Sequence, residues 1–178
     1  DSFSYCRSLI DITVPDSITK IGDNAFNECN SLTSIVIPEG VSLIGAGVFY
    51  ACSNLTNVAI PSSVIFIGRE SFCECKSLAS LTIPANVTSI GVSAFARCTN
   101  LERVYCESIT PPIIFENTFS NSSRNIEIHV PPGSLNNYKA ADYWKDLNLV
   151  EEGNSIQAVD LGLSVKWANC NVGADSPE

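Results

Sequence analysis

The 178-residue sequence contains no methionine, a single histidine and no run of 18 consecutive apolar residues. Without such a run, no membrane-spanning helix is expected. Basic residues are also scarce, because ten Lys and Arg stand against nineteen Asp and Glu, for a net charge of −9. Nucleic acids and anionic lipid surfaces are bound mainly through clustered positive charge, so neither is an expected partner. Hydrophobic residues make up 45% of the chain, which predicts a folded core.

The most informative feature of the sequence is an internal repeat of 23 residues. Three columns define it: Phe3, Phe26, Phe49, Phe72 and Phe95; Cys6, Cys29, Cys52, Cys75 and Cys98; and Leu9, Leu32, Leu55, Leu78 and Leu101. The complete unit reads F-x-x-C-x-x-L-x-x-I-x-I-P-x-x-V-x-x-I-G-x-x-x-F. One unit has too little apolar surface to fold alone, so the copies must stack and share a continuous core.

The spacing within a unit predicts its local structure. L-x-x-I-x-I has the apolar alternation of a short strand, which the following proline ends. V-x-x-I-G fits a second short extended stretch, and x-x-x-F-x-x-C fits a single helical or 3₁₀ turn. One strand in every 20 to 29 residues predicts a leucine-rich repeat solenoid. We expect a parallel β-sheet of six strands on its concave face over residues 1–130, with short strands and 3₁₀ turns on its convex face.

The repeat resembles the BspA-type leucine-rich repeats of surface proteins from anaerobic Gram-negative bacteria. Units such as S-L-T-S-I-V-I-P-E-G-V, which starts at Ser31, carry the resemblance, and it covers residues 1 to about 130. It implies a secreted or cell-surface protein that recognises or adheres to host matrix proteins or other bacterial proteins. It implies neither enzymatic activity nor a cofactor. Two alternatives are a structural spacer that presents a C-terminal domain and the binding region of a larger surface enzyme.

Both ends of the array depart from the repeat. The first unit begins in its middle at Phe3, so we expect a leader or further repeats upstream. Near the other end, residues 109–125 form an altered unit with one added residue. We predict that residues 131–153 then cap the open core, with a helix at about 134–147 that begins at Ser134. This segment also resembles the closing segment of the same family.

Residues 154–178 are expected to form a linker and the truncated start of a second domain. Five apolar residues alternate strictly between positions 159 and 167, which predicts a strand with one apolar face. A single strand cannot bury that face by itself. Self-association through this strand, packing against the cap and a mobile segment are the three ways in which the chain could accommodate it.

The residues that usually carry catalysis or bind metals are here explained by the repeat. Five of the eight cysteines occupy one repeat column and Cys106 occupies a strand-core column, whereas Cys73 and Cys170 lie outside the columns. Bridges between neighbouring rungs are sterically feasible, but we expect buried free thiols. The only histidine, His129, has no nucleophile motif beside it and is expected to be exposed on a strand. No catalytic residue, metal ligand or cofactor is predicted.

The best candidates for ligand binding lie on the concave face. Stacking should produce two ladders: Asp11, Ser34, Asn57, Ser80, Arg103 and Glu127; and Thr13, Val36, Ala59, Thr82, Tyr105 and His129. At the C-terminal rungs Arg103 could pair with Glu127 and Tyr105 could stack on His129, a composition typical of interaction hot spots. We predict a binding surface from Arg103, Tyr105, Glu127, His129, Asn57, Ser80 and Thr82. The alternative is that these are ordinary cross-strand pairs.

A second candidate surface is a hydrophobic patch predicted on the convex face. Leu43 and Phe66 should be stacked neighbours, with Ile65 beside them, at positions that are polar in the outer repeats. A second copy of the chain, another domain or a ligand could cover them. Isolated apolar residues on a surface are also common and need no partner.

Overall fold

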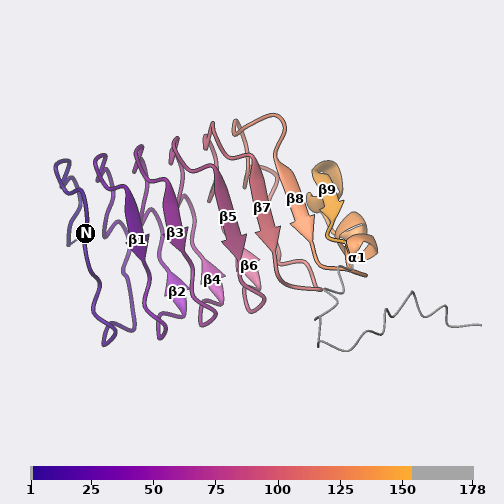
Figure 1. Ribbon diagram of the computed structural model, residues 1–178, viewed down its shortest axis with the longest axis horizontal. Helices are drawn as coiled ribbons and strands as arrows, with labels where there is room; N and C mark the ends of the chain where they lie inside the picture. Colours follow the sequence, from indigo (N-terminus) through magenta and orange to yellow (C-terminus); the bar gives the residue numbers. More distant parts are fainter. Residues whose placement is uncertain (1, 154–178) are drawn as a thin grey trace, which may run out of the picture.

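The computed structural model describes residues 2–153 and shows an elongated stack of rungs, one per repeat (Figure 1). Parallel strands of successive rungs lie side by side and form a row along the long axis. β1 (Ser34–Val36) pairs with β3 (Asn57–Ala59). β5 (Ser80–Ile83), β7 (Arg103–Cys106), β8 (Glu127–Val130) and β9 (Asn148–Glu151) pair in that order as a separate four-stranded sheet. We call the whole row the concave sheet. The leucine-rich repeat solenoid predicted from the 23-residue period is therefore confirmed. The predicted strand at 159–167 and the rest of 154–178 lie outside the described residues.

The register of the strands follows the repeat. Ser34 lies opposite Asn57 and Ser80 lies opposite Arg103, a step of one 23-residue unit in each case. Arg103 lies opposite Glu127, a step of 24, so the altered unit accommodates its added residue before β8. A second parallel sheet is formed by β2 (Leu43–Ile44), β4 (Phe66–Ile67) and β6 (Ser89–Ile90).

The first of the six predicted strands does not form. Residues 11–14 have no strand assignment, although the backbone of Thr33 donates to the carbonyl of Ile10 at 3.2 Å. This rung is at the end of the described array, so it has a neighbour on one side only. A strand with a single partner loses half of its ladder hydrogen bonds.

The third side of each rung, which we call the turn layer, comprises residues 22–31, 45–54, 68–77 and 91–100. It contains i to i+3 hydrogen bonds of the 3₁₀ type, such as Cys29 N–H to the carbonyl of Phe26 at 3.2 Å. A left-handed residue before each repeat cysteine prevents a continuous helix, with φ between 54° and 62° at Tyr5, Glu28, Ala51, Glu74 and Arg97. The backbone N–H of Glu28 donates to the backbone carbonyl of Tyr50 in the next rung at 2.8 Å. Hydrogen bonds therefore join the rungs on all three sides.

A ladder of phenylalanine rings forms the middle of the core. Neighbouring rings from Phe3 to Phe119 have centroids 5.2 to 5.6 Å apart and planes within 23° of each other. The buried cysteines pack beside this ladder, and their thiols donate to phenylalanine carbonyls. Cys52 contacts Phe26 at 3.1 Å and Cys75 contacts Phe49 at 3.2 Å. The ladder and these contacts explain why both residue types recur at a fixed step.

The cysteines of residues 2–153 are free thiols, as the repeat predicts. All seven in the described part of the chain are free, and six are buried, whereas Cys6 at the start of the array is exposed. Burial raises the pKa of Cys52 to about 12, and it does the same for Cys98. In the altered unit Ser122 replaces the cysteine, and its hydroxyl donates to the carbonyl of Phe95 at 2.6 Å. The position therefore selects a small side chain with one donor.

The C-terminal cap differs from the long helix predicted at 134–147. It contains a short helix α1 (Leu135–Ala140), a 3₁₀ turn η1 (Trp144–Asp146) and the strand β9, which pairs with β8. The left-handed conformation of Tyr143, with φ 64°, interrupts the helix. Sequence reasoning missed β9, since its residues N-L-V-E lack the alternation of the repeat strands. The indole of Trp144 donates to the carbonyl of Pro112 at 2.7 Å and its ring ends the phenylalanine ladder at Phe119.

Candidate functional site

The strands place all seven predicted concave residues on one face of the sheet. In β3, Val58 is buried while Asn57 and Ala59 are exposed, and the other long strands alternate in the same way. Arg103 and Tyr105 of β7 lie directly opposite Glu127 and His129 of β8. Ser80 and Thr82 of β5 lie opposite Arg103 and Tyr105, and Asn57 is exposed on β3, which pairs with β1. Sheet hydrogen bonds on both sides of β7 hold this face rigid.

The aromatic part of this face is an ordered stack. The rings of Tyr105 and His129 have centroids 4.7 Å apart and planes inclined by 28°. The prediction that His129 is exposed was wrong, because only 14% of its side chain is accessible. Its Nδ1 lies 2.6 Å from Oε1 of Glu152, and its Nε2 lies 3.4 Å from Oε2 of Glu127. Glu152, which directly follows the unpredicted strand β9, therefore joins the candidate surface.

The expected pair between Arg103 and Glu127 does not form. The carboxylate of Glu127 turns toward His129, and the guanidinium of Arg103 lies 4.0 Å from Glu102 Oε2 instead. His129 is two residues from Glu127 on the same strand and face, so its contact with Glu127 competes with the cross-strand pair. About half of the Arg103 side chain remains accessible, at 52%. The guanidinium is thus available to a ligand approaching the sheet.

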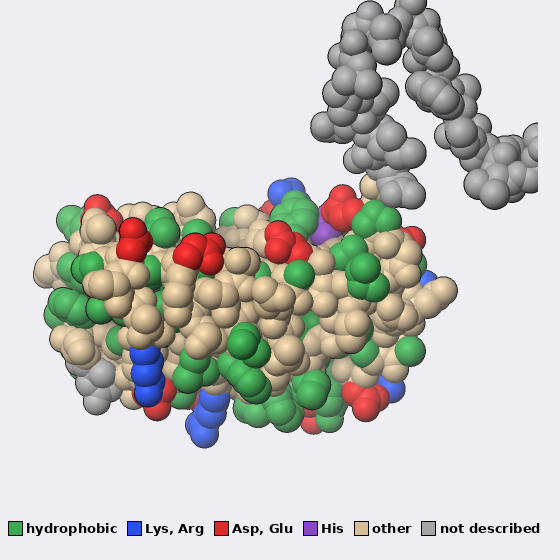
Figure 2. Space-filling view, turned by 90° about the horizontal axis from the view of Figure 1, so that it is seen from below, with side chains coloured by type: hydrophobic (Ala, Val, Ile, Leu, Met, Phe, Trp, Pro, Cys, Tyr) green, Lys and Arg blue, Asp and Glu red, His purple; other side chains and the backbone are tan. Residues whose placement is uncertain are grey.

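The predicted hydrophobic patch lies on the second sheet, between the concave sheet and the turn layer. Leu43 and Phe66 are directly paired between β2 and β4, with Ile65 beside them, and all three side chains are exposed. The row continues through Ser89 to exposed Ile113, which an isolated bridge joins to Ser89. Figure 2 shows exposed hydrophobic side chains gathered on the face seen from below. The patch is therefore a row along the array rather than an isolated cluster.

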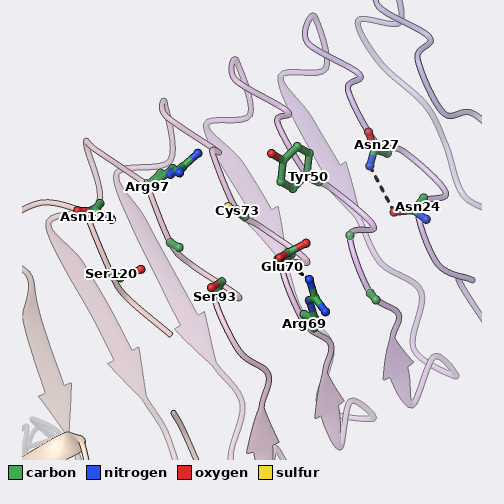
Figure 3. A pocket seen from close by; sticks show the side chains of 13 residues that line it. Asn24, Asn27, Tyr50, Arg69, Glu70, Cys73, Ser93, Arg97, Ser120 and Asn121 are labelled. Carbon is green, nitrogen blue, oxygen red and sulfur yellow. Dashed lines mark hydrogen bonds and ion pairs between the residues drawn. The ribbon is translucent and has the colours of Figure 1, made fainter. Parts of the chain in front are cut away.

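A third surface, which sequence reasoning missed, is an open hollow of about 540 Å³ in the turn layer. We call it the trough. Its floor consists of small residues, and polar side chains from successive rungs surround it (Figure 3). The lining residues are Asn24, Asn27, Ala46, Gly47, Tyr50, Arg69, Glu70, Cys73, Ser93, Ala96, Arg97, Ser120 and Asn121. They occupy variable positions of the repeat, so the 23-residue period by itself does not identify them.

The charges of the trough are largely compensated. Arg97 binds Glu74 at 2.7 Å, and this hydrogen bond lowers the pKa of the Glu74 carboxyl. Arg69 lies 3.0 Å from Glu70. Burial raises the pKa of the Tyr50 phenol, with a further contribution from the charge of Glu74, so the phenol stays protonated at neutral pH. The trough is polar, but it carries no excess positive charge.

Two kinds of feature are absent from residues 2–153. No group of three or more His, Cys, Asp or Glu side chains is arranged to hold a metal ion in this part of the chain. No helix among the same residues is long and apolar enough to cross a membrane.

Comparison with known proteins agrees with this geometry. Residues 1–127 match the model of the BspA type leucine rich repeat region in six copies. A leucine-rich repeat protein from Bacteroides ovatus is 30% identical with a TM-score of 0.61, and the match covers 72% of this chain and 35% of that one. A leucine rich cell surface protein from Faecalibacterium prausnitzii is 28% identical with a TM-score of 0.65, covering 80% and 35%.

A third solved structure, the leucine-rich repeat protein of T. pallidum, is 27% identical with a TM-score of 0.59 and covers 84% of this chain and 75% of that one. Of the structures from Bacteroides ovatus and Faecalibacterium prausnitzii, this chain spans only 35% of the length. No curated protein matches the chain.

Proposed function

Because the chain belongs to the family of BspA-type leucine-rich repeat proteins, we propose that it is a non-enzymatic recognition module of a secreted or cell-surface protein. Its partner in this proposal is another protein, from a host matrix or from a bacterial surface. Similarity to a leucine rich cell surface protein supports the location. The row of parallel strands supports the role, since stacked repeats present an extended surface without the need for a catalytic pocket.

The observation that carries the proposal is the cluster at the C-terminal rungs of the concave sheet. An accessible Arg103 lies on the same strand and face as Tyr105, whose ring stacks on His129, and the Glu127 carboxylate lies 3.4 Å from His129 Nε2. Arginine and tyrosine are enriched in the residues that dominate protein interfaces. Strands paired on both sides hold these groups in place, so little conformational entropy is lost when a partner binds.

A quadruple alanine variant of Arg103, Tyr105, Glu127 and His129 tests the proposal. We expect it to lose capture of the purified extracellular-matrix proteins and bacterial surface proteins that the unchanged chain binds in a surface plasmon resonance panel. At least one member of the panel should bind the unchanged chain. Loss of a hot-spot cluster should weaken that binding by about a hundredfold or more. The melting temperature of the variant should stay close to that of the unchanged chain.

The matched control replaces Glu39, Ser62, Lys76 and Asp142, four exposed residues outside the strands. This variant should bind as well as the unchanged chain. Equal capture by the concave-face variant would refute the proposed site. If the unchanged chain binds no member of the panel, the recognition role fails and the spacer role becomes the better explanation.

A further inference from the structure

The trough in the turn layer is separate from the concave face, and its shape is that of a channel along the array. Its lining residues come from five successive rungs, from Asn24 in one to Asn121 in another (Figure 3). Rungs in a parallel stack repeat at about 4.8 Å. An elongated ligand with a short repeat could therefore meet equivalent positions of several rungs.

Backbone N–H groups that line the trough already have hydrogen-bond partners, which excludes a peptide that binds by strand addition. The N–H groups of Gly47, Glu70 and Arg97 donate to the carbonyls of the next rung at 2.9 to 3.0 Å. A peptide that binds by strand addition needs unpaired backbone donors and acceptors. The trough provides none at these positions, so a ligand must be recognised by side chains.

The side chains of the trough exclude two more kinds of ligand. Arg97 is held by Glu74 and Arg69 by Glu70, so an anion would have to displace a carboxylate. The whole chain carries a net charge of −9, which also repels anions. An apolar ligand would leave the amides of Asn24 and Asn27 without hydrogen-bond partners other than each other.

The remaining groups suit a ligand rich in hydroxyls. Asn24, Asn27 and Asn121 offer paired donors and acceptors, Glu70 offers a carboxylate, and Tyr50 offers a ring face with a phenol. Adjacent hydroxyls on a sugar ring can donate and accept at once, and the apolar face of the ring can pack on an aromatic side chain. We propose that the trough binds a neutral oligosaccharide chain that lies along the turn layer.

Titration of the ¹⁵N-labelled chain with maltohexaose, cellohexaose, chitohexaose and mannohexaose tests the proposal. At least one of them should shift the amide signals of residues lining the trough and leave those of β7 and β8 unchanged. A double variant with Asn27→Ala and Tyr50→Ala should bind it about tenfold more weakly, as expected for the loss of an aromatic and a polar anchor. Tyr105→Ala, which removes a tyrosine from the concave face, is the matched control and should bind normally.

A second variant, Ala46→Gln, fills the floor of the trough without removing a packed ring, and it should weaken binding while the protein keeps its melting temperature. Failure of all four oligosaccharides to shift the trough signals would overturn the proposal. Stronger binding there by a heparin hexasaccharide or by an unstructured peptide would overturn it as well. The result is independent of the concave site, since that site is tested with different residues and with protein ligands.

Discussion

The glycine that follows each second-sheet strand is a point at which the backbones of neighbouring rungs approach closely. A Cβ atom added at Gly68 would lie 2.6 Å from the backbone of Gly45, and one added at Gly91 would lie 2.5 Å from the backbone of Arg69. Gly22 has the same place in its unit, but nothing lies within 4 Å of its added Cβ, because the described part of the preceding rung begins only after the equivalent position. The glycine column therefore reflects contact between rungs rather than backbone conformation.

This difference predicts opposite outcomes for two identical substitutions. Gly68→Ala should lower the free energy of unfolding by about 1 to 3 kcal/mol, since backbone atoms of two rungs must move apart. Gly22→Ala is the control and should change it by less than about 0.5 kcal/mol. Urea unfolding followed by circular dichroism measures both. Equal effects of the two substitutions would show that the close approach of the rungs is not what the glycine column preserves.

At the scale of elements, the C-terminal cap supplies contacts that a further rung would otherwise make. Trp144 packs on Phe119 at 6.1 Å and, edge on, against Tyr138 at 5.2 Å. The hydroxyl of Tyr138 donates to the carbonyl of Ser108 at 2.9 Å, which fastens α1 to the segment between β7 and the altered unit. Terminal units of a solenoid need such a cover, because the last rung would otherwise leave its core face in water.

Truncation of the cap's central side chain should therefore destabilise its end of the array. Trp144→Ala is expected to cost about 3 to 5 kcal/mol, since it opens a cavity and leaves the Pro112 carbonyl without its donor. Hydrogen exchange should rise more in β8 and β9 than in β1 and β3. Lys145→Ala, which removes an exposed neighbour on η1, is the control and should leave the exchange pattern unchanged. A uniform rise along the array after Trp144→Ala would contradict this role of the cap.

The sequence predicted the repeated elements well and the irregular ones poorly, for a physical reason. Each repeated strand appears several times, so its apolar alternation and its register can be identified by comparison of one unit with the next. β9 occurs once, has no equivalent in the repeat, and is stabilised by pairing with β8. The turn after α1 depends on the left-handed backbone of Tyr143, a conformation that its residue type does not indicate.

The candidate surfaces show the same limit. The strand register placed Arg103 opposite Glu127, as expected from the repeat and the added residue. Side-chain pairing did not follow from the register, because Glu127 contacts His129 of its own strand and Glu152 contacts the other side of the imidazole. The trough depends on side chains at positions that vary between units, and periodicity alone does not predict that these positions form a hollow.

At the scale of the whole molecule, each rung is joined by backbone hydrogen bonds to the rungs before and after it, in the turn layer and in most of the strands. A structure of this kind gains stability from each rung and from each interface between neighbours. The 23-residue step is then the quantity that the fold must conserve, more than the number of rungs. Whole rungs should be removable, whereas partial rungs should not.

Deletion of residues 46–68 tests this, because it removes 23 residues and joins Gly45 to Arg69 in the same repeat phase. The variant should keep a β-rich circular dichroism spectrum and unfold cooperatively at a lower temperature. Its urea m-value should fall by about a sixth, in proportion to the surface of one rung among six. Deletion of residues 46–57 removes only half a unit, turns core positions toward solvent, and should prevent folding. A 23-residue deletion that fails to fold would show that the rungs are not interchangeable and that stability depends on contacts beyond nearest neighbours.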